Sequence, residues 1–273
     1  TEIYTLSLHD ALPISSGQHV INQTFALFNR TLRQQASAGI GNGMVGAGVV
    51  SATITNVSAY GPTASASLGV HAIDAATGDY ADARVRGAWA APLGARGTID
   101  SDGNAGALDW WTAGIAGGYE GVVDVGSGNA VAGFAFGYLR SGGTVDARLS
   151  SMDADGFHLG AYGAWTNGPW SLAGSAAYAA SSISTHRQII VGGINRTPEA
   201  DYWNHTIGLS TELAYAFEMN SGFTISPLFT LDAGWSGNGG YSETGAGALG
   251  LTSTGQGYGW LDTGLGIALA HTI

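Results

Sequence analysis

The feature that most constrains this chain is a repeated alternation between apolar residues and small or polar ones. In residues 207–217, Ile207, Leu209 and Leu213 share one parity, and the neighbouring positions hold Gly, Ser, Glu and Ala. Successive side chains of a β-strand point to opposite faces, so such a strand has one apolar face and one small, polar face. Eight stretches of about ten residues follow this rule, namely 83–91, 109–123, 129–140, 155–165, 170–182, 207–217, 223–235 and 258–270. The pattern predicts an all-β fold, a transmembrane antiparallel up-and-down β-barrel with apolar residues facing lipid.

The composition favours the same architecture. Only 11% of the residues are charged, against about 25% in ordinary soluble domains. The sequence has no run of apolar residues long enough to predict a transmembrane helix. It contains nine Lys and Arg against twenty Asp and Glu, and this net charge of −11 argues against nucleic acid as a partner. Cysteine is absent, which excludes disulfides and thiolate metal sites.

The turns between the expected strands differ in length. Short turns are expected at 166–169 and 220–222, where Asn and Gly suit tight hairpins. Long loops are expected at 92–108, 141–154, 184–202 and 236–257. This asymmetry predicts short turns on the periplasmic side and long loops outside. Seven tryptophans near the expected strand ends predict an aromatic girdle, namely Trp89, Trp110, Trp111, Trp165, Trp170, Trp203 and Trp235.

The region before the strands divides into three parts. Residues 1–14 are similar to one translated reading frame of a short-read sequencing adapter, and we interpret them as a non-native segment. Ile21, Phe25, Phe28 and Leu32 form one apolar stripe, which predicts an amphipathic helix at about 18–36 within a segment 15–38. Residues 39–82 are rich in Gly, Ala and Ser and are expected to be a linker, whereas 83–273 would form the barrel.

The order and spacing of several short motifs resemble the C-terminal translocator β-domain of autotransporters, the proteins of type V secretion. The motifs lie at 112–120, 133–138, 155–162, 212–215, 225–227 and 241–245, with Arg187 after the fifth expected strand. The resemblance implies a barrel of about twelve strands in the outer membrane of a Gram-negative bacterium. It also implies a helix threaded through the pore, a secreted passenger domain upstream, and insertion by the barrel-assembly machinery.

One departure from this family concerns the number of strands. Counted from the sequence, about eight of the twelve strands are present, because the chain stops at Ile273 without the terminal aromatic residue of the family. The chain is therefore interpreted as a gene fragment. A sheet with two unpaired edges is expected to fold poorly in lipid and to aggregate through those edges.

The sequence offers little chemistry. No metal-binding pair of histidines, calcium loop or nucleophile elbow occurs, so neither a cofactor nor an enzymatic activity is expected. Charged or polar residues on the inward parity are candidate lumen-lining residues, namely Arg84, Arg86, Glu120, His158, Arg187, Glu212, Asp232 and Asp262. They would either hydrate the pore and pair across it, or hold the helix through Arg30 and Arg33 facing Glu120 or Glu212. The predicted function is a translocator that anchors and exports a passenger; the alternatives are a diffusion pore or a soluble β-rich adhesin.

Overall fold

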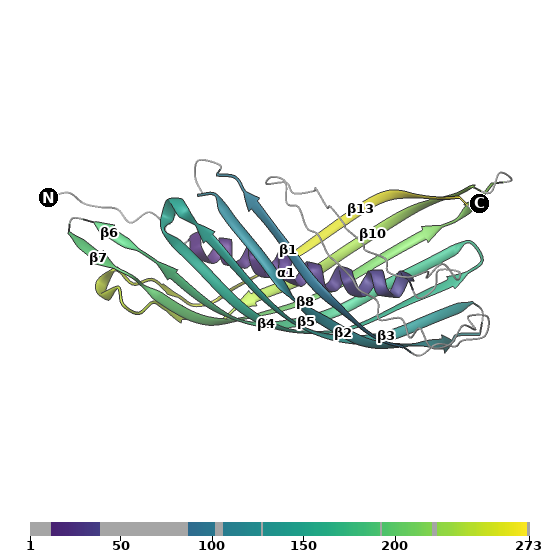
Figure 1. Ribbon diagram of the computed structural model, residues 1–273, viewed down its shortest axis with the longest axis horizontal. Coiled ribbons are helices and arrows are strands. Elements are labelled where there is room, and N and C mark those ends of the chain that lie inside the picture. The colour runs from purple at the N-terminus through teal and green to yellow at the C-terminus, as the bar shows by residue number, and fades with distance from the viewer. Residues whose placement is uncertain are drawn as a thin grey trace.

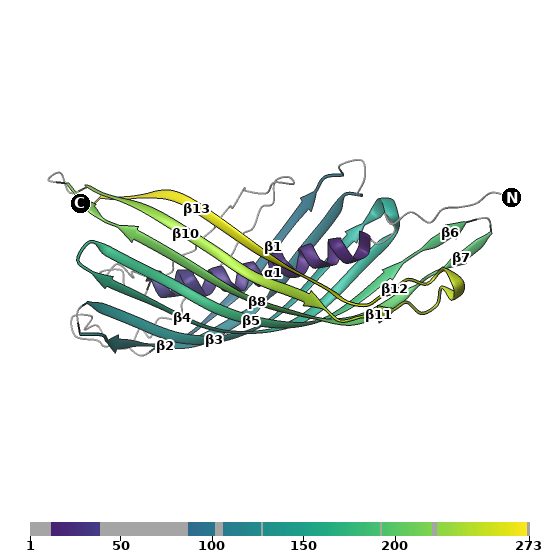
Figure 2. The same ribbon diagram turned by 180° about the vertical axis from the view of Figure 1, so that it is seen from behind.

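The protein is an antiparallel β-sheet that curves around a single helix (Figures 1 and 2). The computed structural model describes residues 12–38, 87–101, 106–126, 128–191, 193–219 and 223–271. The eight long strands are β1 (Gly87–Ile99), β2 (Leu108–Asp124), β3 (Asn129–Val145), β4 (Ser150–Asn167), β5 (Trp170–Arg187), β8 (Glu199–Tyr215), β10 (Phe223–Asn238) and β13 (Gln256–His271). They lie side by side in this order, and the short β9 (Phe217–Glu218) also pairs with β10. The expected all-β, up-and-down meander is confirmed, and in the described residues β1 and β13 are the two unpaired edges of the sheet.

The alternation of side chains matches the sequence-based expectation closely. On β3, Phe134, Phe136 and Tyr138 are exposed on the outer face, and the residues between them are buried or half-buried. On β4, Phe157 and Leu159 point outward, whereas His158 and Tyr162 point inward. The outer face is therefore a continuous apolar surface, as a lipid-facing sheet requires.

The strands are longer than predicted, so the connections are shorter than expected, and the long loop predicted at 141–154 is wrong. β1 runs on to Ile99, and β3 and β4 extend until a single short turn, η2 (Asp146–Arg148), separates them. The longer connections contain small hairpins, β6 (Ile189–Val191) with β7 (Ile194–Arg196) and β11 (Tyr241–Ser242) with β12 (Thr252–Ser253), besides η3 (Gly247–Leu249). Strands of 16 to 18 residues exceed the roughly 9–11 that span a bilayer. Backbone pairing thus continues past the point where the apolar alternation stops.

Tight turns close the opposite end of the sheet. Gly168 joins β4 to β5 with φ of 57°, a conformation that favours glycine, so the turn expected at 166–169 is confirmed. The turn expected at 220–222 lies outside the described residues.

Helix α1 (Leu12–Ala38) lies along the concave side of the sheet. It is longer than the expected 18–36 and begins within the segment interpreted as adapter-derived. At about 1.5 Å per residue, its 27 residues extend about 40 Å. Among the described residues, no helix has both the length and the apolar character needed to cross a membrane. The expected linker, 39–82, lies outside the described residues.

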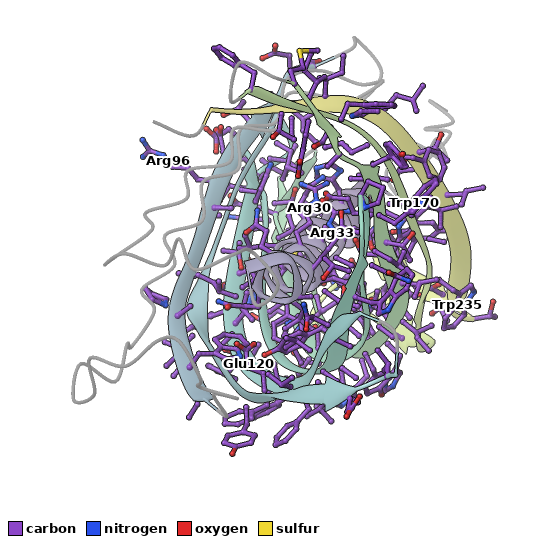
Figure 3. The ribbon with its side chains drawn as sticks, turned by 90° about the vertical axis from the view of Figure 1, so that its right-hand side faces the viewer. Arg30, Arg33, Arg96, Glu120, Trp170 and Trp235 are labelled. Atoms are coloured by element: carbon purple, nitrogen blue, oxygen red, sulfur yellow. The ribbon has the colours of Figure 1, made fainter. Side chains whose placement is uncertain are left out.

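Two tryptophans are not part of the predicted girdle. Trp89 and Trp110 face inward and are only 8% and 2% exposed. Trp111, Trp170 and Trp235, in contrast, are exposed on the outer face, and Figure 3 shows Trp235 outside the curved sheet. Proximity to a strand end did not predict which tryptophans belong to the girdle, because the parity of a residue along its strand decides whether its ring faces lipid or the helix.

Candidate functional site

The candidate site is the concave interior of the sheet, which α1 occupies. Phe25, Phe28 and Leu32 on the helix are at most 1% exposed and pack against inward-facing residues of the sheet. Closer to the start of α1, Val20 and Ile21 pack in a second cluster with Leu108, Met152 and other inward residues. The apolar stripe predicted from sequence is therefore the face that packs most tightly, and the helix fills the interior.

Glycines make this close packing possible. A Cβ atom on Gly208 would lie 2.6 Å from Phe25 Cε1, and one on Gly137 would lie 2.9 Å from Phe28 Cε2. A Cβ on Gly160 would overlap Leu32 Cδ1. The inward parity was predicted to be small, but the sequence did not show which small residues receive the helix.

Buried polar contacts hold the first half of the helix. Gln18 donates to the Ser236 hydroxyl at 2.7 Å, and the Asn204 amide lies 3.1 Å from the same Gln18 nitrogen. Thr206 and Ser236 are 2.8 Å apart in this network. A buried polar network of this kind specifies the position of the helix relative to the sheet, because the polar groups would lose their hydrogen-bond partners if the helix moved.

Further along the helix, Ser175 of β5 bonds Asn29. Its hydroxyl lies 2.7 Å from Asn29 Oδ1 and 3.1 Å from the Asn29 carbonyl. The Ser175 side chain is 3% exposed. The sequence analysis missed this contact; the inward parity of Ser175 was the available signal.

The arginines of α1 face β8, β10 and β13. Arg33 Nη1 donates to Ser210 at 3.0 Å and lies 3.6 Å from Asp232 Oδ2, while Arg30 experiences the charges of Asp232 and Asp262. Figure 3 shows both arginines inside the sheet. The hypothesis that they face Glu120 or Glu212 is therefore wrong for Arg33, because the curvature of the sheet brings Asp232 of β10 to this side of the helix.

Glu120 has a different partner. It accepts a hydrogen bond of 2.8 Å from Tyr162, whose hydroxyl also accepts one of 2.6 Å from the Trp89 indole. Tyr162 reaches β2 by lying across Gly133, which is paired with both Glu120 and Tyr162. This chain of contacts ties β1, β2 and β4 together and does not involve the arginines of the helix.

His158 lies on the inner face of the sheet. It is 2% exposed, its ring centroid is 5.1 Å from that of Phe28, and neither ring nitrogen has a hydrogen-bond partner among the described residues. His158 thus acts as part of the packed wall. Within those residues, no group of three or more His, Cys, Asp or Glu side chains is placed to hold a metal ion.

Arg187 lies at the far end of β5 and ties this end to the connection between β10 and β13. Its guanidinium donates two hydrogen bonds to Glu243, at 2.7 and 2.6 Å, and one to the Leu249 carbonyl. The Arg187 and Glu243 side chains are 12% and 6% exposed. Burial, and next the charge of Glu243, raises the pKa of the neighbouring Tyr241 hydroxyl. We refer to the Arg187–Glu243 pair as the outer clasp.

The remaining predicted residues are placed as follows. Glu212 lies half-buried on the inward parity, and no hydrogen bond or ion pair to it is found among the described residues. Asp262 stands directly across from Asp232 in the pairing of β13 with β10. Arg84 and Arg86 lie outside the described residues.

Comparison with known protein families identifies the chain. A model of the autotransporter β-domain family matches residues 88–273, which is more than half of the sequence. Comparison with curated proteins gave no match. The matched region covers nearly the whole sheet, and its meander of strands with an apolar outer face agrees with the family assignment. The chain therefore belongs to the autotransporter β-domain family, the outer-membrane translocators of Gram-negative bacteria that serve a linked passenger domain in type V secretion.

Proposed function

We propose that α1 is the segment that fills the translocation path, and that a passenger joined ahead of it is exported through the interior of the sheet. The observation that carries this proposal is the position of α1, whose apolar stripe is buried against the concave face. A diffusion pore would be expected to keep this interior open. The sheet then serves as anchor and conduit, with its apolar outer face held in lipid.

The orientation of the helix supports the proposed direction of export. The first turns of α1 lie near Asn204, which follows the longer connection before β8, and near Ser236, which precedes the longer connection after β10. Figures 1 and 2 show this end of α1 on the same side as β6, β7, β11 and β12. Longer connections of barrels of this kind face outward. A passenger joined to this end of α1 would therefore emerge on the cell surface.

A reporter experiment tests this orientation. A short protease-sensitive peptide placed ahead of α1 should be cut by protease added to intact cells. The same peptide inserted at Gly168, in the tight turn between β4 and β5, should be protected until the outer membrane is opened. Protection of the first site, or cleavage at Gly168 in intact cells, would overturn the proposed function.

We further propose that the domain has no catalytic residues of its own. Two carboxylates of the interior are engaged in structural contacts, since Asp232 pairs with Arg33 and Glu120 accepts from Tyr162. Insertion by the barrel-assembly machinery is also proposed. The unpaired edges of β1 and β13 support it, because an open edge can add a strand from another protein through main-chain hydrogen bonds.

Asp232→Asn should loosen the helix. The change removes the carboxylate charge that lies 3.6 Å from Arg33. The side chains of Arg33 and Asp232 are 15% and 29% exposed. A loss of about 1 kcal/mol would raise undocking of α1 about five-fold. Hydrogen exchange of the α1 amides, measured on the folded chain in detergent, checks this. Glu212→Gln is the matched control on the same inward face and should leave the exchange unchanged; equal acceleration by both changes would contradict the assignment.

A further inference from the structure

We propose that Gly137, Gly160 and Gly208 are seats that fix the depth and rotation of α1, so that export ends with the same residues at the outer mouth each time. This inference rests on the proposed function of α1. We call these three glycines the seats, and Phe25, Phe28 and Leu32 the knobs. The seats lie on β3, β4 and β8, on the inward face of each strand.

Each knob occupies the space that a Cβ atom would fill if the facing seat were any residue other than glycine. The imagined Cβ atoms of Gly208 and Gly137 approach Phe25 and Phe28 to 2.6 and 2.9 Å, distances that real Cβ atoms essentially never show. The Gly160 Cβ would overlap Leu32 and also lie 3.4 Å from Phe28. The three knobs are 0–1% exposed. They lie at i, i+3 and i+7, and therefore form one narrow stripe of the helix.

Gly137 and Gly160 each lie between two buried side chains on the inward face of their strands. Along the inward face of β3, Gly137 lies between Ala135 and Leu139, which are 2% and 0% exposed. Gly160 lies between His158 and Tyr162 on β4, which are 2% and 4% exposed. Inward residues two apart on a strand are separated by about 6.6 Å. A helix that moved by one turn, about 5.4 Å, would press its knobs against side chains instead of seats.

Polar contacts agree with the same register. Asn29 meets Ser175 at 2.7 Å and Arg33 meets Ser210 at 3.0 Å when the knobs are seated. Gln18 meets Ser236 at 2.7 Å at the outward end. Because apolar and polar contacts from three regions of the helix are satisfied together, one position of α1 is favoured over its neighbours.

Disulfide trapping measures this register directly, since the native chain has no cysteine. Asn29→Cys is combined in turn with Ala173→Cys, Ser175→Cys or Ala177→Cys, which are successive inward positions of β5. With the native seats, the Ser175 position should cross-link at least five times faster than the other two. Cross-linking spread evenly over the three positions would overturn the proposal.

Filling a seat should disturb the register, and trimming the knob should restore it. In the Asn29→Cys, Ser175→Cys background, Gly160→Val should slow cross-linking at least five-fold, and adding Leu32→Ala should return it to within two-fold. Gly160→Ala should give a smaller effect in the same direction. Gly174→Ala is the matched control, because its Cβ would point to the outer face and come no closer than 3.4 Å to another atom; it should change nothing.

The outcomes separate this inference from the proposed function. Slow hydrogen exchange of the amides in the middle of β4 identifies the folded protein in each sample. If Gly160→Val alone does not fold but the double variant Gly160→Val, Leu32→Ala does, the result supports the seat. If neither variant folds, or if Gly160→Val alone cross-links at the normal rate, the result contradicts it. A register-specific cross-link in a protein whose reporter never reaches the surface would leave the seats standing and reject the export function. A reporter displayed on the cell surface together with an even spread of cross-links would support the export function and reject the seats.

Discussion

Replacing Arg187 by Met should destabilise the outer clasp by about 3–5 kcal/mol. The change leaves Glu243 as a buried carboxylate, 6% exposed, without the guanidinium that donates to both of its oxygens. The Leu249 carbonyl loses a donor as well. The connection between β10 and β13 would then separate from the end of β5.

Hydrogen exchange localises this effect. The amides of Glu243 and Thr244 bond the carbonyls of Leu251 and Glu199, so their exchange should accelerate by at least a hundred-fold, a factor consistent with about 3 kcal/mol. Amides in the middle of β4 should be unaffected. The double change Arg187→Met, Glu243→Met should recover part of the loss, because no unpaired charge remains.

Arg140→Met is the matched control for the clasp. Arg140 lies 3.8 Å from Asp155 on the outer face, and the side chains are 59% and 46% exposed. Exposed pairs contribute at most about 1 kcal/mol. If Arg140→Met and Arg187→Met had equal effects, burial would not be what makes the clasp strong.

The 273-residue chain, reconstituted alone into lipid vesicles, should associate through its sheet edges and not migrate as a heat-resistant monomer. In the described residues, neither β1 nor β13 has a second neighbouring strand. Lipid offers no hydrogen-bond partners, so each unpaired backbone group costs several kcal/mol. A second copy of the same edge supplies the missing partners.

Single cysteines locate this association. Thr263→Cys on the edge strand β13 should form disulfide-linked dimers readily under mild oxidation. Ala161→Cys on β4, an interior strand, is the matched control and should remain monomeric. A compact, heat-resistant monomer that gives no dimer with Thr263→Cys would show that the edges are satisfied in another way.

The strands and the helix could be predicted because their signal is local. Phe157 and Leu159 alternate with His158 and Gly160, so the period of the backbone itself assigns each side chain to a face. The helix stripe from Ile21 to Leu32 has the same kind of local origin. Strand ends were harder to predict, because outside the lipid the outer face becomes polar. Arg140 opposite Asp155 and Ser184 opposite Asp201 show that the backbone ladder continues there without an apolar alternation.

The contacts of the interior were decided by tertiary structure. Inward parity correctly placed Asp232, Glu212 and Glu120 on one face of the sheet, but it carried no information about which of them would meet Arg33. That choice depends on the curvature and stagger of the sheet, which bring β10 toward the helix and turn Glu120 toward Tyr162. The elements and their faces follow from side-chain periodicity, which is a local property of the sequence. Only the folded sheet decided the partners, because they come from strands far apart in sequence whose relative positions are set by curvature and register.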